Sequence, residues 1–200
     1  MKSVNLNSAY QKQKNLTQRK NITAYKVGAS NHRSAEFFGY EGILLGGLDN
    51  SCIYRDKVPK NYSVAEAEII TRILVNDGRT NFTVLEHLVG IECPNAVLSN
   101  PEASPFICIV DNCSSGDLLV FQKLHHLDFE RVDVYGNGEL LASGVMSNLK
   151  YSISNIVNEA FRTISEFELP FESKDILIAT GGITDTFSLT ANAQLEIKCE

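Results

Sequence analysis

Residues 64–74, with the sequence VAEAEIITRIL, place two carboxylates one residue apart, at Glu66 and Glu68. In an extended strand, alternate side chains point to the same face, so the two acids would converge. In a helix they would point in nearly opposite directions, because only positions three and four apart are neighbours. Two converging carboxylates repel each other unless a cation lies between them, and magnesium and manganese prefer such oxygen ligands. A strand here therefore predicts a candidate metal site.

Two interpretations of this stretch stay open when it is taken alone. Its apolar residues also fit a helix, and periodicity does not separate helix from strand in so short a window. Glu-x-Glu is moreover a frequent pattern of a solvated face, since acidic side chains are mostly exposed. The metal-site hypothesis therefore depends on the rest of the chain.

The composition bounds the class of protein. The chain has 200 residues, 44% of them hydrophobic and 21% charged, which predicts one folded domain or a domain with a small appendage. Its net charge of −6 includes no long run of one sign, which argues against a nucleic-acid partner. No apolar run approaches the length of a membrane span, and residues 1–14 lack the apolar core of a signal sequence. We therefore expect a cytoplasmic protein without a membrane partner, and its five cysteines, with no CxxC pair, to be reduced thiols.

Hydrophobic patterning and turn residues predict a chain made mostly of strands. A polar helix is expected at residues 6–19, and an amphipathic helix at 152–168, where apolar residues recur at helical spacing before Pro170. Glycines between residues 39 and 47 predict a loop, the segment NDGRTN a turn, and Gly136-Asn137-Gly138 a hairpin turn. An amphipathic stretch is expected at residues 84–89. Strands are predicted at residues 22–28, 105–112, 117–124, 129–135, 139–145, 175–180, 186–190 and 193–199.

Two further charged residues stand in apolar surroundings. Lys26 lies between Tyr25 and Val27 in a predicted strand, where it either reaches solvent or, pointing inward, must pair with an anion or lose its proton. Glu92 lies between apolar residues just before a proline. At that position an acid is either solvated at a strand end or a ligand.

Several segments in order carry a family resemblance. They are AYKVGAS, the Glu66 and Glu68 pair, GIECP around Glu92, IVDNCSSG, GNGELLASG, the long helix and KDILIATGGIT. Taken together they resemble the fumarylacetoacetate hydrolase superfamily, and within it the branch of 2-oxo-4-pentenoate hydratases and 4-oxalocrotonate decarboxylases. The chain resembles a shortened, divergent member.

The resemblance implies a fold and a set of site residues. The implied fold is α+β, a β-rich roll of the fumarylacetoacetate hydrolase C-terminal type with peripheral helices, with a short N-terminal helical segment (residues 1–20) before a catalytic domain (residues 21–200). It implies Mg²⁺ or Mn²⁺ as cofactor, and a homo-oligomer or association with a partner enzyme of the same family. The implied site residues are Glu66, Glu68 and Glu92 as metal ligands, Lys26 in the substrate pocket as a catalytic residue, and Ser114, Ser115 and Thr180 near the substrate.

The sequence also departs from the pattern of that family. The N-terminal region is shortened, and Tyr40-Glu41-Gly42 stands where an acid, an aromatic residue and a glycine are usual. Either Glu41 is the displaced catalytic acid, or the acid has been lost. Gly46-Gly47 stands where relatives carry an acidic pair, and the interval between Glu68 and Glu92 is compressed. The metal set is thus intact while the proton-transfer set is altered.

The resemblance and the chemistry of the residues lead to one functional hypothesis with alternatives. A small 2-oxo acid can chelate a divalent metal, which as a Lewis acid stabilises the enolate, while Lys26 supplies a second cation or shuttles a proton. This predicts a metal-dependent lyase of the hydratase type. The alternatives are a decarboxylase of an oxalocrotonate-like 2-oxo diacid and a catalytically degenerate partner subunit. Hydrolysis of a 1,3-diketone is less favoured. That reaction needs a general base, normally a histidine with an acid in the N-terminal region, and His32 is the only histidine before the glutamate pair.

Overall fold

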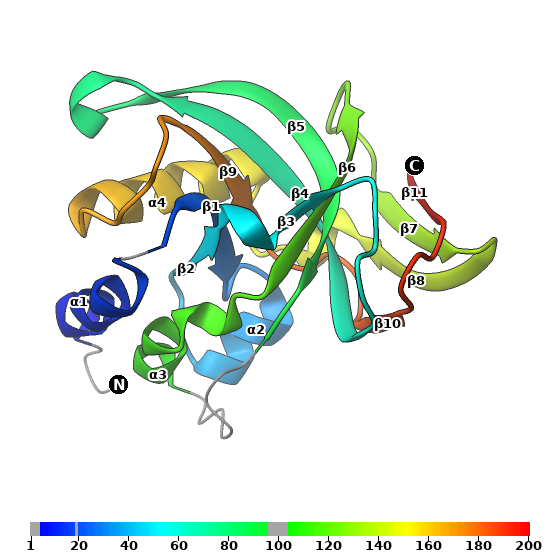
Figure 1. Cartoon of the computed structure of the whole chain (residues 1–200), viewed down its shortest axis with the longest axis horizontal. Coiled ribbons are helices and arrows are strands. Elements are labelled where there is room, and N and C mark those ends of the chain that lie inside the picture. The colour runs from blue at the N-terminus through cyan, green and yellow to red at the C-terminus, as the bar shows by residue number, and fades with distance from the viewer. Residues whose placement is uncertain (1–4, 19, 96–103) are drawn as a thin grey trace.

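A computed structural model of the chain describes residues 5–18, 20–95 and 104–200. Within these residues an eight-stranded mixed sheet has the order β2-β1-β9-β4-β5-β6-β3, with β10 paired to β4, and a three-stranded sheet has the order β11-β7-β8 (Figure 1). The strands of the larger sheet are β1 (Ile22–Gly28), β2 (Leu44–Asp49), β3 (Ile53–Arg55), β4 (Tyr62–Val75), β5 (Phe82–Cys93), β6 (Asp117–Leu124), β9 (Asp175–Ala179) and β10 (Phe187–Leu189). Those of the smaller sheet are β7 (Arg131–Gly136), β8 (Glu139–Val145) and β11 (Leu195–Cys199), and the α-helices are α1 (Leu6–Thr17), α2 (His32–Phe38), α3 (Pro105–Val110) and α4 (Ile153–Glu166).

The stretch that left helix and strand open is the strand β4. Its apolar residues pack on both faces of the sheet: Ile69 and Ile73 belong to the main core, whereas Ile70 lies in a second cluster on the opposite face. Burial on both faces explains why the run shows no clean alternation of apolar and polar residues. Glu66 and Glu68 share the face of Ile70, as alternate positions of one strand must.

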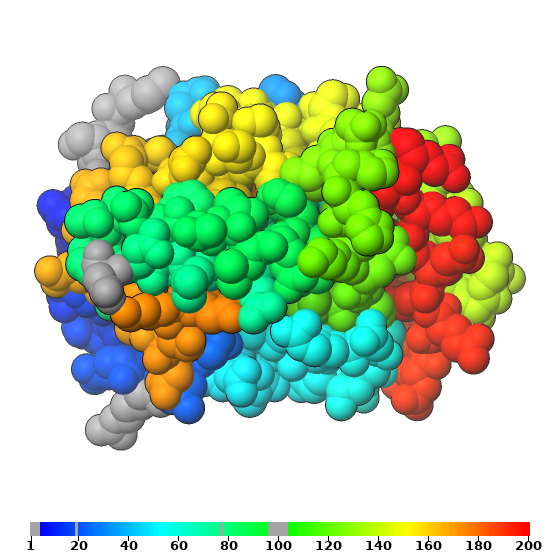
Figure 2. Space-filling view, turned by 90° about the horizontal axis from the view of Figure 1, so that it is seen from above, coloured from blue at the N-terminus to red at the C-terminus, as the bar shows by residue number. Residues whose placement is uncertain are grey.

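The longest structural feature is the hairpin of β4 and β5, which lies across one face of the molecule between α4 and the segment that precedes β9 (Figure 2). Its turn contains Gly78, whose φ of 75° is in the left-handed region that favours glycine. Phe82, at the start of β5, packs on Phe161 of α4 with ring centroids 4.8 Å apart. The predicted turn is confirmed, and the predicted amphipathic stretch at residues 84–89 is part of a longer strand.

The two predicted helices are present. Ser152 caps α4 by accepting a hydrogen bond from the Asn155 amide, and the apolar stripe of α4 is buried as predicted. The N-terminal helix α1 ends at Thr17; residue 19, the predicted end, lies outside the described residues. Buried Gln13 of α1 donates to the carbonyls of Leu45 in β2 and Ile109 in α3, so α1 packs into the main core. A domain division at residue 20 stays a prediction.

The prediction of a buried strand at residues 105–112 is wrong. These residues form α3, followed by the single 3₁₀ turn η3 (Asn112–Ser114). Ser104 caps the helix by accepting a hydrogen bond from the Ile107 amide, and Pro105 occupies the first turn, where its missing N–H is not needed. The apolar run is therefore that of a short helix packed against the core.

The predicted loop at residues 39–47 is also wrong over its second half. Gly39 ends α2 in the left-handed conformation, with a φ of 56°, but β2 begins at Leu44 and includes Gly46 and Gly47. A Cβ atom on Gly46 would lie 2.1 Å from the carbonyl oxygen of Asn112. Glycine at this position therefore lets the η3 turn lie directly on β2. Hydrophobic patterning alone does not predict this contact.

Candidate metal centre

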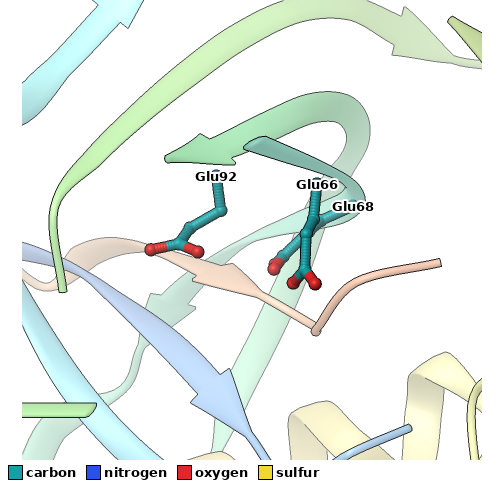
Figure 3. A group of neighbouring side chains, drawn as sticks. All are labelled: Glu66, Glu68 and Glu92. Carbon is teal, nitrogen blue, oxygen red and sulfur yellow. The ribbon is translucent and has the colours of Figure 1, made fainter. Parts of the chain in front are cut away.

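Three glutamates converge on one point from the two strands of the long hairpin. Glu66 of β4 lies directly opposite Glu92 of β5, and Glu68 follows two residues later on the same face of β4. Figure 3 shows their carboxyl groups reaching into a shared space below the strands. One carboxylate oxygen from each lies within 4.8 Å of the others. The strand register therefore brings together the set of acids that was expected from the sequence.

Burial makes this arrangement electrostatically demanding. Glu68 and Glu92 are fully buried, whereas Glu66 retains partial exposure. Glu68 Oε2 accepts a hydrogen bond of 2.9 Å from the Gly181 amide. Glu92 Oε1 lies 3.0 Å from Lys26 Nζ, and the Lys26 ammonium and the Gly116 amide stabilise its charge. Two neighbouring buried carboxylates that share one ammonium cost free energy when both are charged, unless a cation binds between them.

The pKa directions follow from this geometry. Burial raises the pKa of Glu68 well above its ordinary value, and the nearby Glu92 carboxylate raises it further. Burial likewise raises the pKa of Glu92, although the Lys26 ammonium partly offsets that effect. Burial alone would lower the pKa of Lys26, but Glu92 and Glu68 outweigh it, and the pKa of Lys26 is raised. The lysine is therefore a fixed cation at neutral pH.

The donor set fits a divalent cation. Three carboxylates meet one buried ammonium, which leaves the cluster negative when all are ionised. Arg33 pairs with Glu66 at 3.3 Å, but its side chain is 60% exposed and it also pairs with Asp185 at 3.0 Å. Carboxylate oxygens are the ligands that hard ions such as magnesium and manganese take. The convergence of three carboxylates, two of them fully buried, beside a single buried ammonium is the observation on which this fit depends.

The three glutamates lie in the wall of a cavity of about 370 Å³. The volume is in the range of sites for small ligands. Charged residues gather at one end, polar side chains come from the β1–α2 segment and η3, and two phenylalanines of α2 add an apolar wall. The lining includes Lys26, Glu66, Glu68, Glu92, Ser30, Asn31, Arg33, Ser34, Ser114, Phe37, Phe38, Pro94, Cys108 and Cys113.

The other predicted site residues divide between the cavity and its surroundings. Lys26 and Ser114 line the cavity. Ser115 does not, and its hydroxyl donates to the Asn112 carbonyl within the η3 turn. Thr180 is fully buried and donates to the Ile69 carbonyl at 2.9 Å, which ties the end of β9 to β4.

Glu41 is placed elsewhere. Its side chain is 83% exposed and pairs with Lys150, and it lines a separate depression with Tyr151. The structure does not bring Glu41 to the cavity, so its geometry gives no support to a catalytic role.

Sequence reasoning missed the residues that α2 contributes. Asn31 accepts a hydrogen bond from the Ser34 amide as the N-cap of α2, and its side-chain amide donates to the Gly182 carbonyl. This helix places Arg33 and Phe37 at the cavity. The N-cap signal was present in the sequence, since an asparagine directly before a run of helix-compatible residues is a typical helix start.

Comparison of the chain with known proteins finds similarity in three-dimensional structure. No protein-family model and no curated protein sequence matches it. Solved structures do: it shares the α+β fold of a 4-oxalocrotonate decarboxylase and of a fumarylpyruvate hydrolase, and the α+β fold implied by the resemblance is confirmed.

Three of these structures are particularly informative. The 4-oxalocrotonate decarboxylase of Pseudomonas putida G7, complexed with magnesium and adipate, is 18% identical over 98% of this chain and 82% of its own, with a TM-score of 0.74. The same enzyme complexed with calcium and acetate matches over 94% of this chain and 80% of its own, with 18% identity and a TM-score of 0.70. The fumarylpyruvate hydrolase of Pseudomonas aeruginosa, in complex with Mn²⁺ and pyruvate, is 13% identical over 88% of this chain and 84% of its own, with a TM-score of 0.57. At these identities the likeness establishes the fold.

Proposed function

We propose that the protein is a divalent-metal-dependent lyase of the hydratase type, which acts on a small 2-oxo acid or its enol through an enolate. The observation that carries the proposal is the convergence of Glu66, Glu68 and Glu92, two of them fully buried, in the wall of a cavity large enough for such a substrate. The similar solved structures support it, because they hold magnesium, calcium or manganese together with small carboxylates.

The three glutamates would hold Mg²⁺ or Mn²⁺. When bound, such an ion supplies Lewis-acid stabilisation of the negative charge that develops on the oxygen of a 2-oxo acid. The buried carboxylates contribute ligand oxygens that the protein has already removed from water. Glu68 is oriented by the Gly181 amide, and Glu92 by the ion pair with Lys26.

Lys26 would act as a fixed cation beside the developing oxyanion. Because its pKa is raised, its ammonium form persists at neutral pH, which favours charge stabilisation over the alternative role as a base. Lys26 is buried and paired with Glu92, so the ammonium is held at a fixed place in the cavity wall. An electrostatic role of this kind requires such pre-organisation.

The remaining cavity residues would position the substrate. Ser114 and Asn31 offer polar groups at the cavity wall, and Phe37 and Phe38 limit the access of water on the side of α2. Ser115 and Thr180 contact backbone carbonyls instead, so we propose that they position the η3 turn and the β4–β9 junction.

Decarboxylation of an oxalocrotonate-like 2-oxo diacid is the second candidate. The likeness to 4-oxalocrotonate decarboxylase over 98% of this chain favours it. Both reactions use the same enolate, so the fold does not separate them. With Mg²⁺ present, loss of the ultraviolet absorbance of a 2-hydroxydienoate without release of carbon dioxide identifies the hydratase, and release of carbon dioxide from a 2-oxo diacid identifies the decarboxylase.

The test of the site is calorimetric titration with magnesium and oxalate, a stable analogue of the enolate. Wild-type protein should bind oxalate only when the metal is present, and Glu92→Gln should lose this binding. Glu86→Gln is the matched control: it lies on the same strand, pairs with Arg72 and Lys123 outside the cavity, and should retain binding. Absence of binding by the wild type would favour the third candidate, a catalytically degenerate relative that serves as a homo-oligomeric or partner subunit.

A further inference from the structure

Two cysteines lie together in the wall of the same cavity. Cys108 is in α3 and Cys113 is in the η3 turn that follows it, and both line the cavity. Their thiols are in hydrogen-bond contact with each other. All five cysteines of the chain have free thiols. The pair plays no part in the proposed chemistry, which leaves its close approach to be explained.

The backbone holds the two thiols face to face. Asn112, Cys113 and Ser114 have φ values of 55°, 51° and 54°, three consecutive non-glycine residues in the left-handed region. The turn lies between α3 and β6 and leaves Cys113 lining the same cavity as Cys108. The Asn112 side chain fixes the turn to β2, since it accepts from the Gly47 amide at 2.8 Å and donates to the Gly47 carbonyl at 2.7 Å.

The two thiols differ in character, as an attacking and a resolving cysteine must. Cys108 is partly exposed, and the hydrogen bond from Cys113 lowers its pKa. Cys113 is buried, and burial raises the pKa of its thiol. Lys26 adds positive charge near both sulfurs. Thiolate character and access to the cavity therefore coincide at Cys108.

We propose that Cys108 and Cys113 form a redox-active dithiol that peroxides oxidise to an intramolecular disulfide in the cavity wall. The Cys108 sulfur attacks one peroxide oxygen, the O–O bond breaks, and water leaves to give a sulfenic acid at Cys108. The Cys113 sulfur then attacks the Cys108 sulfur, the S–O bond breaks, and a second water leaves. Two thiols and one hydrogen peroxide thus give one disulfide and two waters, with the sulfurs oxidised and the peroxide reduced.

The experiment is disulfide mapping of the full chain after graded treatment with hydrogen peroxide. Remaining thiols are alkylated with N-ethylmaleimide, and the protein is cleaved before aspartate, which separates Cys108 from Cys113 at Asp111. The peptide that contains Cys108, residues 77–110, also contains Cys93, so fragment-ion sequencing of the joined peptides assigns the bridge. We expect a disulfide between Cys108 and Cys113 that dithiothreitol reverses. Cys52 and Cys199, whose pKa values are raised by burial, should still be alkylated at the same dose.

Variants test the assigned roles. Cys113→Ser should leave a sulfenic acid at Cys108 that dimedone traps, and Cys108→Ser should leave Cys113 reduced. Cys52→Ser, the matched control, should retain the disulfide. Oxidation of Cys52 or Cys199 before the pair, or sulfinic acid at Cys108 with Cys113 still alkylated in the wild type, would overturn the proposal. The mapping uses no metal or substrate, so its outcome is independent of the proposed lyase function.

Discussion

Lys26 and Glu92 form an ion pair inside the sheet, and a second acid, Glu68, lies beside them without a cation of its own among the described residues. The charge on each group therefore depends on the others and on whatever the cavity binds. Two predictions concern these side chains individually.

The first prediction is a pH dependence of stability. Glu68 has a raised pKa in the folded protein, so it binds its proton more tightly there than in the unfolded chain. Its contribution to stability is fully present below the ordinary pKa of glutamate and is lost as the pH rises through the raised value. Glu68→Gln mimics the protonated form, so without metal it should be at least ~1 kcal/mol more stable than wild type at neutral pH.

Denaturant unfolding of chelator-treated protein at about pH 4.5 and at neutral pH checks this, and the difference between variant and wild type should shrink at the acidic pH. The pKa shift of Glu86 has the opposite sign, because the hydrogen bond that it accepts from Arg72 lowers its pKa. Its contribution is lost as the pH falls, so Glu86→Gln should not be stabilising at neutral pH. A Glu68→Gln variant less stable than wild type at both pH values would contradict the assignment.

The second prediction separates metal binding from chemistry. Lys26→Met removes the ammonium but keeps a chain of similar length, so the three carboxylates remain available. Metal affinity should be retained or increased, while kcat falls by roughly 10²–10³-fold, the usual contribution of one group that stabilises a developing oxyanion. Steady-state kinetics together with metal titration measure the two effects. Equal loss of both would mean that Lys26 serves to assemble the metal site.

Among the elements, the η3 turn is held in position by side-chain hydrogen bonds to β2. Asn112 makes two hydrogen bonds to Gly47 of β2. Its carbonyl oxygen lies so close to Gly46 that a Cβ atom on Gly46 would have no room. We predict that Asn112→Ala destabilises the protein by about 1–3 kcal/mol, because the Gly47 amide and carbonyl lose their partners. Thermal unfolding measures this. Asn15→Ala, at an exposed position of α1, should change stability by less than about 0.5 kcal/mol, and an equal loss in both variants would count against the η3 contact.

Elements also show what the sequence alone could and could not predict. The α4 helix and the β7–β8 hairpin were predictable, because each has an apolar period or a turn signal of its own. The β4 strand was not, since burial on both faces removes the alternation on which the assignment relies. For α3, the Ser104-Pro105 start signal was outweighed by the apolar run after it. The convergence of Glu66 with Glu92 depends on strand register, which a single segment does not contain.

At the scale of the whole molecule, the two strands that carry the acids are the longest of the described strands, and they arch over α4 in Figure 1. No helix of the described part is long and apolar enough to cross a membrane.

An ion held between β4 and β5 would bind only the folded chain. At a concentration 100 times its dissociation constant, it should stabilise the fold by about 2.7 kcal/mol.

The corresponding measurement is the unfolding temperature with and without Mg²⁺ or Mn²⁺. We expect a concentration-dependent increase that a chelator reverses, and no increase for Glu66→Gln combined with Glu92→Gln. The double variant also removes the partner of buried Lys26, so the metal response of each protein is measured against its own metal-free unfolding temperature. A metal response that survives both changes would place the ion elsewhere.

The pairing of Glu66 with Glu92 has a consequence for how this hairpin can vary in length. Successive side chains of a strand alternate, so one residue inserted between Glu68 and Glu92 would turn Glu92 to the other side of the sheet, unless a bulge absorbed it. The ladder already contains such an irregularity between Arg72 and Ile73. Removing residues in matched pairs from the tip preserves the parity, so a hairpin with a compressed interval still delivers all three acids to the same place.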